Sequence, residues 1–166
     1  MALQVDVGDW TITIVQSNAE SFNDTFDEAP VDLIVMASSE DKKKSMAEKG
    51  SVSTTGADIG GEVTGIRYLA KAPGFSEGDA NQPQMDSGTL QVALTKILES
   101  VSFNDTFDAA PIVITGYYGT DADWKGGKTS AANITTTGAD VASEIKETGD
   151  NCNWIAVYTD GFFDPA

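Results

Sequence analysis

A ten-residue segment of this chain is written twice. The first copy, SFNDTFDEAP, runs from Ser21 to Pro30, and the second, SFNDTFDAAP, runs from Ser102 to Pro111. Nine of the ten residues are identical, which chance does not produce in a chain of 166 residues. We interpret the pair as a tandem duplication, so any fold that the first half adopts must also be available to the second half.

Shorter echoes accompany the repeated segment in the same order. The pentapeptide TTGAD occurs at Thr54–Asp58 and returns at Thr136–Asp140. Further along, YLA at Tyr68–Ala70 is matched by WIA at Trp154–Ala156. The order of these segments is therefore repeated as well as the segments themselves, which strengthens the interpretation as a duplication.

The duplication predicts two domains, residues 1–80 and residues 81–166. Each begins with a similar strand, because GDWTITIV from Gly8 resembles GTLQVAL from Gly88. The predicted join lies in residues 72–88, which are rich in Gly, Pro, Asp and Asn. Two copies are too few for a solenoid, so we expect a pair of small domains.

The residue pattern between the echoes predicts β-strands. Branched and polar residues alternate in Trp10–Val15 and in Leu90–Leu94, as in half-buried strands. Three further segments are rich in β-branched or aromatic residues, namely Val31–Ala37, Ile112–Tyr118 and Asn153–Tyr158. The sequence therefore predicts an all-β fold of two tandem small antiparallel β-sandwich domains.

Other segments are expected to be irregular. The stretch SSEDKKKSMAEKG at Ser38–Gly50 is expected to form a long charged loop with a helical turn. NDT and TTGAD are expected to be turns, because Asn, Asp and Gly suit turn conformations. On either side of the NDT turns, Phe22, Phe26, Phe103 and Phe107 are predicted to be buried and to anchor a corner of each sandwich.

Composition excludes several classes of function. The net charge is −16 and the chain has no histidine, so a Ser-His-Asp triad and a histidine-based metal site are both excluded. Nucleic acid and anionic membrane surfaces are unsuitable partners for so acidic a chain. Cys152 is the only cysteine, which leaves no internal disulfide and no CxxC metal motif. We expect no enzyme activity, with an acidic hydrolase as the remaining enzymatic alternative.

The second half resembles the H-type lectin family. The matching pattern is Val101, Phe103, Phe107 and Pro111, then IVIT, TTTGA and NWIA. The resemblance implies a small antiparallel β-sandwich that assembles as trimers or hexamers. Similar modules occur in phage tail fibres and other virion proteins.

The sugar site of that family is not carried over to this chain. Members that bind N-acetylgalactosamine have an arginine before the T-x-x-G strand and a Trp-His pair after it. At these places this chain has DWKGGKTSAAN and DVASEIKETGDN, and Arg67 belongs to a different strand. We therefore expect the fold of the family without its sugar chemistry.

The resemblance and the composition together suggest a structural or adhesion component of a phage particle, in the tail, fibre, neck or capsid surface. The sequence has no N-terminal signal pattern, and we expect the protein in the virion. Expected partners are two further copies in a homotrimer, other virion proteins and a host surface glycan, without membrane insertion. Phe162 and Phe163, in the C-terminal segment GFFDPA, are the expected assembly residues.

The alternative function is a lectin with a non-standard sugar site. Exposed aromatic residues beside carboxylates are typical of such sites, and Trp124 and Tyr117 with Asp121 and Asp123 are the candidates. No cofactor is expected. If calcium binds, Asp121 and Asp123 in DADWKG are the first candidates, although this loop lacks the further ligands of a calcium site.

Overall fold

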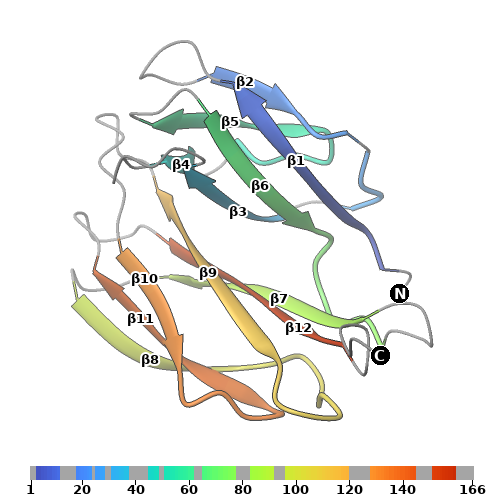
Figure 1. Cartoon of the computed structure of the whole chain (residues 1–166), viewed down its shortest axis with the longest axis vertical. Helices are drawn as coiled ribbons and strands as arrows, with labels where there is room; N and C mark the ends of the chain where they lie inside the picture. Colours follow the sequence, from blue (N-terminus) through green and yellow to red (C-terminus); the bar gives the residue numbers. More distant parts are fainter. Residues whose placement is uncertain are drawn as a thin grey trace, which may run out of the picture.

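A computed structural model gives the fold of the chain. It describes residues 3–11, 18–23, 25–28, 31–37, 45–48, 51–61, 65–77, 83–91, 96–119, 128–144 and 151–159. All regular secondary structure in these residues is β-strand, as the sequence predicts. Figure 1 shows β1 to β6 in the upper part of the molecule, called the first half below, and β7 to β12 in the lower part, called the second half.

The strands of the first half are β1 (Val5–Thr11), β2 (Asn18–Ser21), β3 (Asp32–Ala37), β4 (Ser45–Glu48), β5 (Gly56–Gly61) and β6 (Gly65–Lys71). Those of the second half are β7 (Gln84–Gln91), β8 (Lys96–Ser102), β9 (Ile112–Gly119), β10 (Lys128–Ala132), β11 (Gly138–Glu144) and β12 (Asn151–Tyr158).

The strands form antiparallel sheets in a repeated order. The first half has the orders β1-β6-β3 and β2-β5-β4, and the second has β7-β12-β9 and β8-β11-β10. β4 and β9 pair in parallel, and this pairing joins two of the sheets into one of six strands, β2-β5-β4-β9-β12-β7. The only parallel pairing of the described strands is therefore the one between the two halves.

Each half has its own hydrophobic core between its two sheets. The first core contains Trp10, Phe22, Phe26, Leu33, Ile59, Ile66 and Tyr68, and the second contains Phe103, Phe107, Tyr117, Val141, Cys152 and Trp154. Inward-facing residues alternate with outward-facing ones, most clearly along β11. The predicted burial of the four phenylalanines is confirmed.

The SFNDTF segment leaves a strand and returns to the core within one short turn. The backbone N–H of Phe103 donates to Thr137 O and that of Phe107 to Thr136 O, both at 2.9 Å. Phe103 and Phe107 then meet edge to face, with ring centroids 5.2 Å apart. In the first half Phe22 and Phe26 have the same arrangement at 5.4 Å. The repeated segment is therefore a corner of each core.

Two expectations about local structure are wrong. Ser45–Glu48 is strand β4 and not loop or helical turn, because it pairs with β5 on one side and with β9 on the other. The Gly-Ala-Asp of each TTGAD begins a strand and does not form a turn. A neighbouring strand lies so close to Gly56 and Gly138 that any side chain at these positions would collide with a carbonyl oxygen of that strand. β6 ends at Lys71 and β7 begins at Gln84, so the connection between them lies within the predicted join at residues 72–88.

Candidate functional site at the junction of the two halves

A carboxylate on the first strand of each half holds the SFNDTF turn. Asn23 donates its backbone N–H to Asp6 Oδ2 at 2.6 Å and its side-chain amide to Asp6 Oδ1 at 3.1 Å. Asn104 makes the same two bonds to Asp86, at 2.6 and 2.8 Å. These aspartates are therefore used to fix a corner of the backbone.

A glutamine two residues before each aspartate makes a second pair of bonds. Gln4 donates to Asp27 Oδ2 at 2.7 Å and accepts the N–H of Asp27 at 3.0 Å. Gln84 and Asp108 repeat the pair at 3.2 and 3.0 Å. The reasoning from sequence missed these residues, although a shared signal is visible, since QVDVG and QMDSG both read Gln-x-Asp-x-Gly.

The strand β3 lies at the junction, against the outer face of the sheet β7-β12-β9. Ile34, Met85 and Ile155 are buried there in one apolar cluster, and Leu3, Leu69, Ile114 and Val157 pack around them. The side chain of Ile34 fills the space over Gly116. This cluster is separate from the cores of the two halves, so it is an interface between them.

Polar bonds cross the same junction. Ser87 donates to Asp32 Oδ2 at 2.6 Å, and Thr89 lies 3.4 Å from Asp32 Oδ1. The side-chain amide of Asn153 donates to Leu33 O at 3.0 Å. A buried carboxylate left without these donors would be costly, so the bonds favour one register between the halves.

Lys71 is the largest buried charged side chain of the described residues, at 2% exposure. Its ammonium group donates to the carbonyl oxygens of Ala72 and Gly74. Burial lowers the pKa of Lys71, and the charges of Asp86 and Asp32 oppose that change. Burial likewise raises the pKa of Asp32, opposed by the Ser87 bond and by the charge of Lys71. The lysine thus secures the chain where it leaves the first half.

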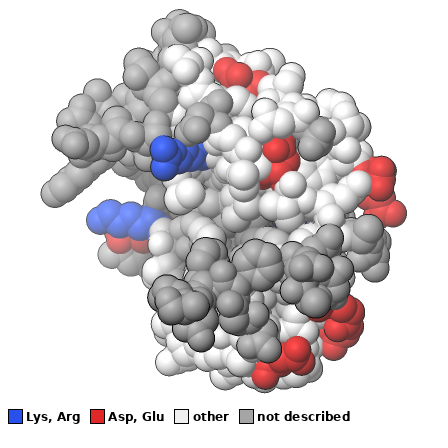
Figure 2. Space-filling model, turned by 45° about the vertical axis from the view of Figure 1, so that its right-hand side comes forward, with Lys and Arg blue, Asp and Glu red and all other residues white. Residues whose placement is uncertain are grey.

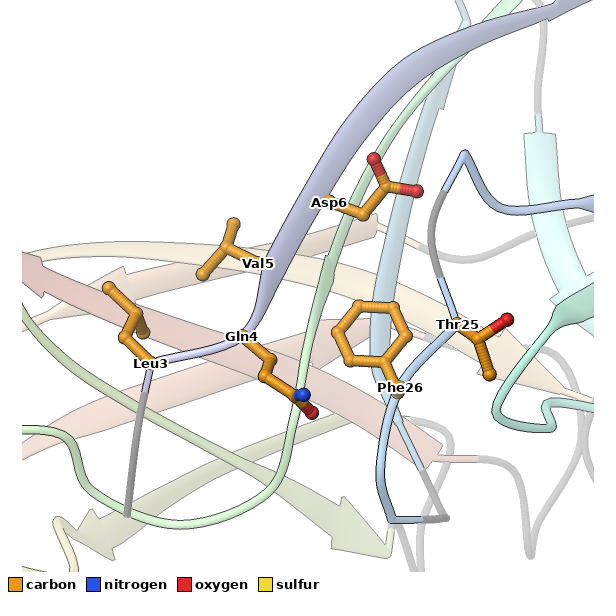
Figure 3. Close-up of a pocket in the computed structure, with 6 residues that line it drawn as sticks. All are labelled: Leu3, Gln4, Val5, Asp6, Thr25 and Phe26. Atoms are coloured by element: carbon orange, nitrogen blue, oxygen red, sulfur yellow. The ribbon is translucent and has the colours of Figure 1, made fainter.

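A surface pocket of about 310 Å³ lies beside the start of β1. Its lining residues are Leu3, Gln4, Val5, Asp6, Thr25 and Phe26. Figure 3 shows the first four in succession where the chain enters β1, with the side chains of Gln4 and Asp6 on the side of Thr25 and Phe26. The pocket thus combines the ring of Phe26 with the polar side chains of Gln4 and Asp6, which bond to Asp27 and Asn23 outside the lining.

Of the four residues predicted to bind ligands, the described structure includes Tyr117 alone. Tyr117 packs in the second core with 6% exposure. Trp124, Asp121 and Asp123 lie outside the described residues, and so do the predicted assembly residues Phe162 and Phe163. The described residues hold no group of three or more Asp, Glu, Cys or His side chains suited to a metal ion.

The thiol of Cys152 is buried in the second core. Burial raises its pKa to about 12, despite an opposing backbone hydrogen bond from Gly116. A thiol with so high a pKa stays protonated at neutral pH and is a poor nucleophile.

The surface carries its acidic residues in separate places. Figure 2 shows Asp and Glu distributed over the visible face, with Lys and Arg at two positions on one side.

Within the described ranges, no helix has the length and apolar character needed to cross a membrane. Comparisons with protein-family models, with curated proteins and with solved structures gave no match.

Proposed function

We propose that this chain is a non-enzymatic structural component of a phage-like particle, built from two tandem β-sandwich domains that arose by duplication. The proposed domains are residues 1–80 and 81–166. One observation in particular supports the duplication. The hydrogen bonds among Gln4, Asp6, Asn23 and Asp27 in the first half are repeated among Gln84, Asp86, Asn104 and Asp108 in the second half. Bonds conserved between halves with different surroundings are expected of two copies of one ancestral unit.

The distribution of apolar residues supports an assembly role. An acidic chain with a charge of −16 is expected to repel its own copies, yet several large apolar side chains are exposed. They are Val5, Val7, Met36, Leu98 and Ile112. Of these, Val5, Val7 and Met36 occupy one face of the sheet β1-β6-β3. Ile34 and Leu69 of the same face pack in the junction cluster, and the exposed valines and methionine beside them are proposed to contact another protein.

The class of particle is proposed from the resemblance to H-type lectins, whose modules occur in phage tail fibres. The proposed partners are two further copies in a homotrimer and other virion proteins, with a host surface glycan as the adhesion partner. Glycan binding near Trp124, Asp121 and Asp123 remains a prediction, without a contact from Tyr117, which is buried. Calcium binding by Asp121 and Asp123 also remains a prediction.

Light scattering of the purified chain tests the assembly. We expect a trimer in moderate salt that loosens at low ionic strength, because repulsion between acidic subunits is then least screened. A monomer at every salt and protein concentration would contradict the proposal. An antibody raised against the chain should also label intact particles from the source organism, and labelling of free protein alone would count against a virion component.

A further inference from the structure

A short segment between β6 and β7 pairs with the edge of the sheet in the second half. The backbone N–H of Ser76 donates to Met85 O at 2.7 Å, and the N–H of Met85 donates to Ser76 O at 3.1 Å. Met85 belongs to β7, the terminal strand of its sheet. Gly74, two residues earlier, has a φ of 88°, a conformation that favours glycine and turns the chain into this pairing.

The same segment places an aromatic ring on the corner of the second core. Phe75 meets Phe107 edge to face, with ring centroids 5.0 Å apart, and Phe107 is 1% exposed. The segment therefore makes two kinds of contact at once. Its backbone extends the sheet, and its aromatic side chain covers the phenylalanine of the SFNDTF turn.

The first half has the same site without this segment. The Gln-x-Asp sequences at the start of β1 and β7 make the same bonds, so Val5 corresponds to Met85. Phe26 corresponds to Phe107 through the repeated segment. Val5 and Phe26 both line the pocket of about 310 Å³, so the pocket lies at the place that Phe75 takes in the second half. Val5 is 37% exposed, whereas Met85 is 4% exposed.

The backbone of Val5 offers the same two groups as that of Met85. The N–H of Ala72 donates to Gln4 O at 3.0 Å, so Gln4 directs its backbone groups toward β6. Val5, the next residue, directs its own N–H and C=O to the opposite side, because these groups alternate along a strand. β1 is the terminal strand of β1-β6-β3, and Val5 has no backbone hydrogen bond on that side to any residue that the structure describes.

These features define the ligand that the site suits. It must supply an aromatic ring and, on the next residue, a free N–H and C=O in extended conformation. Peptides that add a strand to an open sheet edge are recognised in this way, with affinity from backbone bonds and specificity from a side-chain pocket. The net charge of −16 disfavours an acidic peptide.

We propose that the pocket beside Phe26 binds an extended segment of another protein, which places an aromatic side chain on Phe26 and pairs its next residue with the backbone of Val5. The occupied site around Phe75 in the second half is the template for this contact. The proposal goes beyond the proposed function, because it needs neither a trimer nor a particle.

A synthetic peptide tests the site. The probe is APGFSK, residues 72–77 with Glu77→Lys and blocked ends, titrated into the isotope-labelled full chain and followed by NMR. We expect saturable shifts at the amides of Val5 and Phe26, with a Kd on the order of 1 mM or tighter. Replacing the phenylalanine of the peptide by alanine should weaken binding about tenfold or more, because the buried ring is lost.

Variants of the chain test the backbone pairing. Val5→Pro removes the N–H that faces the open edge without removing a bond between β1 and β6, and it should weaken the peptide about fivefold. Thr11→Pro is the matched control, an exposed position at the other end of β1 whose N–H faces the same edge by alternation. It should leave the affinity unchanged. The peptide variants test the site even where a proline variant does not fold.

Three outcomes would overturn the site. They are no saturable shift at Val5 and Phe26 at any soluble peptide concentration, equal binding of the alanine peptide, and shifts at Met85 and Phe107 instead, which would mean that the peptide displaces Phe75. Light scattering separates this result from the proposed assembly. A monomeric chain that binds the peptide at Val5 and Phe26 would keep the site and refute the trimer alone.

Discussion

The two halves share their interior bonds and differ in what covers them. Asp6 and Asp86 receive the same pair of bonds from Asn23 and Asn104. Asp6 also accepts the hydroxyl of Tyr68 at 2.9 Å, and the residue at the place of that tyrosine in the second half is Trp154. The repeated sequence therefore specifies the corner, while the residues around it have been free to change.

The outer faces differ far more than the interiors. In the second half, β7-β12-β9 is covered by β3, and serine, threonine and asparagine there bond to the first half. In the first half, the corresponding face carries exposed valine and methionine. Two halves can thus have similar cores and different outer faces, because the core and the outer face use alternate residues of the same strands.

The largest effect is expected from the corner phenylalanines. Phe107→Ala should lower the free energy of unfolding by about 3–5 kcal/mol, because the ring is enclosed by Phe103 and Phe75. Phe26→Ala should cost clearly less, because one side of that ring already borders the pocket. Urea denaturation of both variants measures the difference. Equal losses would mean that the pocket is closed in solution.

A smaller and equal effect is expected from the hydroxyls before the TTG turns. Ser53 Oγ and Thr135 Oγ1 each donate to a glycine carbonyl oxygen at 3.0 Å, in Gly56 and Gly138. Ser53→Ala and Thr135→Val should each cost about 1 kcal/mol, since each removes one set of turn bonds. The two costs are measured from the shift of the urea unfolding midpoint in each variant, provided that the m-value is unchanged. A cost twice as large in one half would show that the two turns are not equivalent.

The smallest effect concerns the pH dependence of the junction. The pKa of Asp32 is raised above 3.8 by burial, so the folded state holds this proton more tightly than the unfolded state. The contribution of Asp32 to stability is therefore full below pH 3.8 and is lost as the pH rises through the raised pKa. Asp32→Asn should remove this pH dependence. The measurement is the free energy of unfolding of both proteins at a series of pH values from below 3.8 to neutral. An unchanged pH profile in the variant would assign the dependence to another group.

Much of the interior of this protein follows from the sequence by itself. The repeated segment places equivalent phenylalanines at two corners, and the β-branched and aromatic residues of Asn153–Tyr158 predict a strand that the structure contains within β12. These features depend on neighbours close in sequence and on the simple rule that aromatic and branched residues are buried, so a local pattern is enough to predict them.

The tertiary structure alone decided the rest. Ser45–Glu48 has a charged, helix-compatible sequence and is a strand because β5 and β9 offer partners on both sides. Gly56 and Gly138 are residues typical of turns, but each begins a strand. Glycine is needed there because the backbone of a neighbouring strand lies close to both positions. The junction residues Asp32, Lys71 and Ser87 gave no local signal, since their function depends on a surface that is brought to them by chain folding. Contacts between residues distant in sequence are not specified by any one segment, and they exist only when both cores have formed and their outer faces meet.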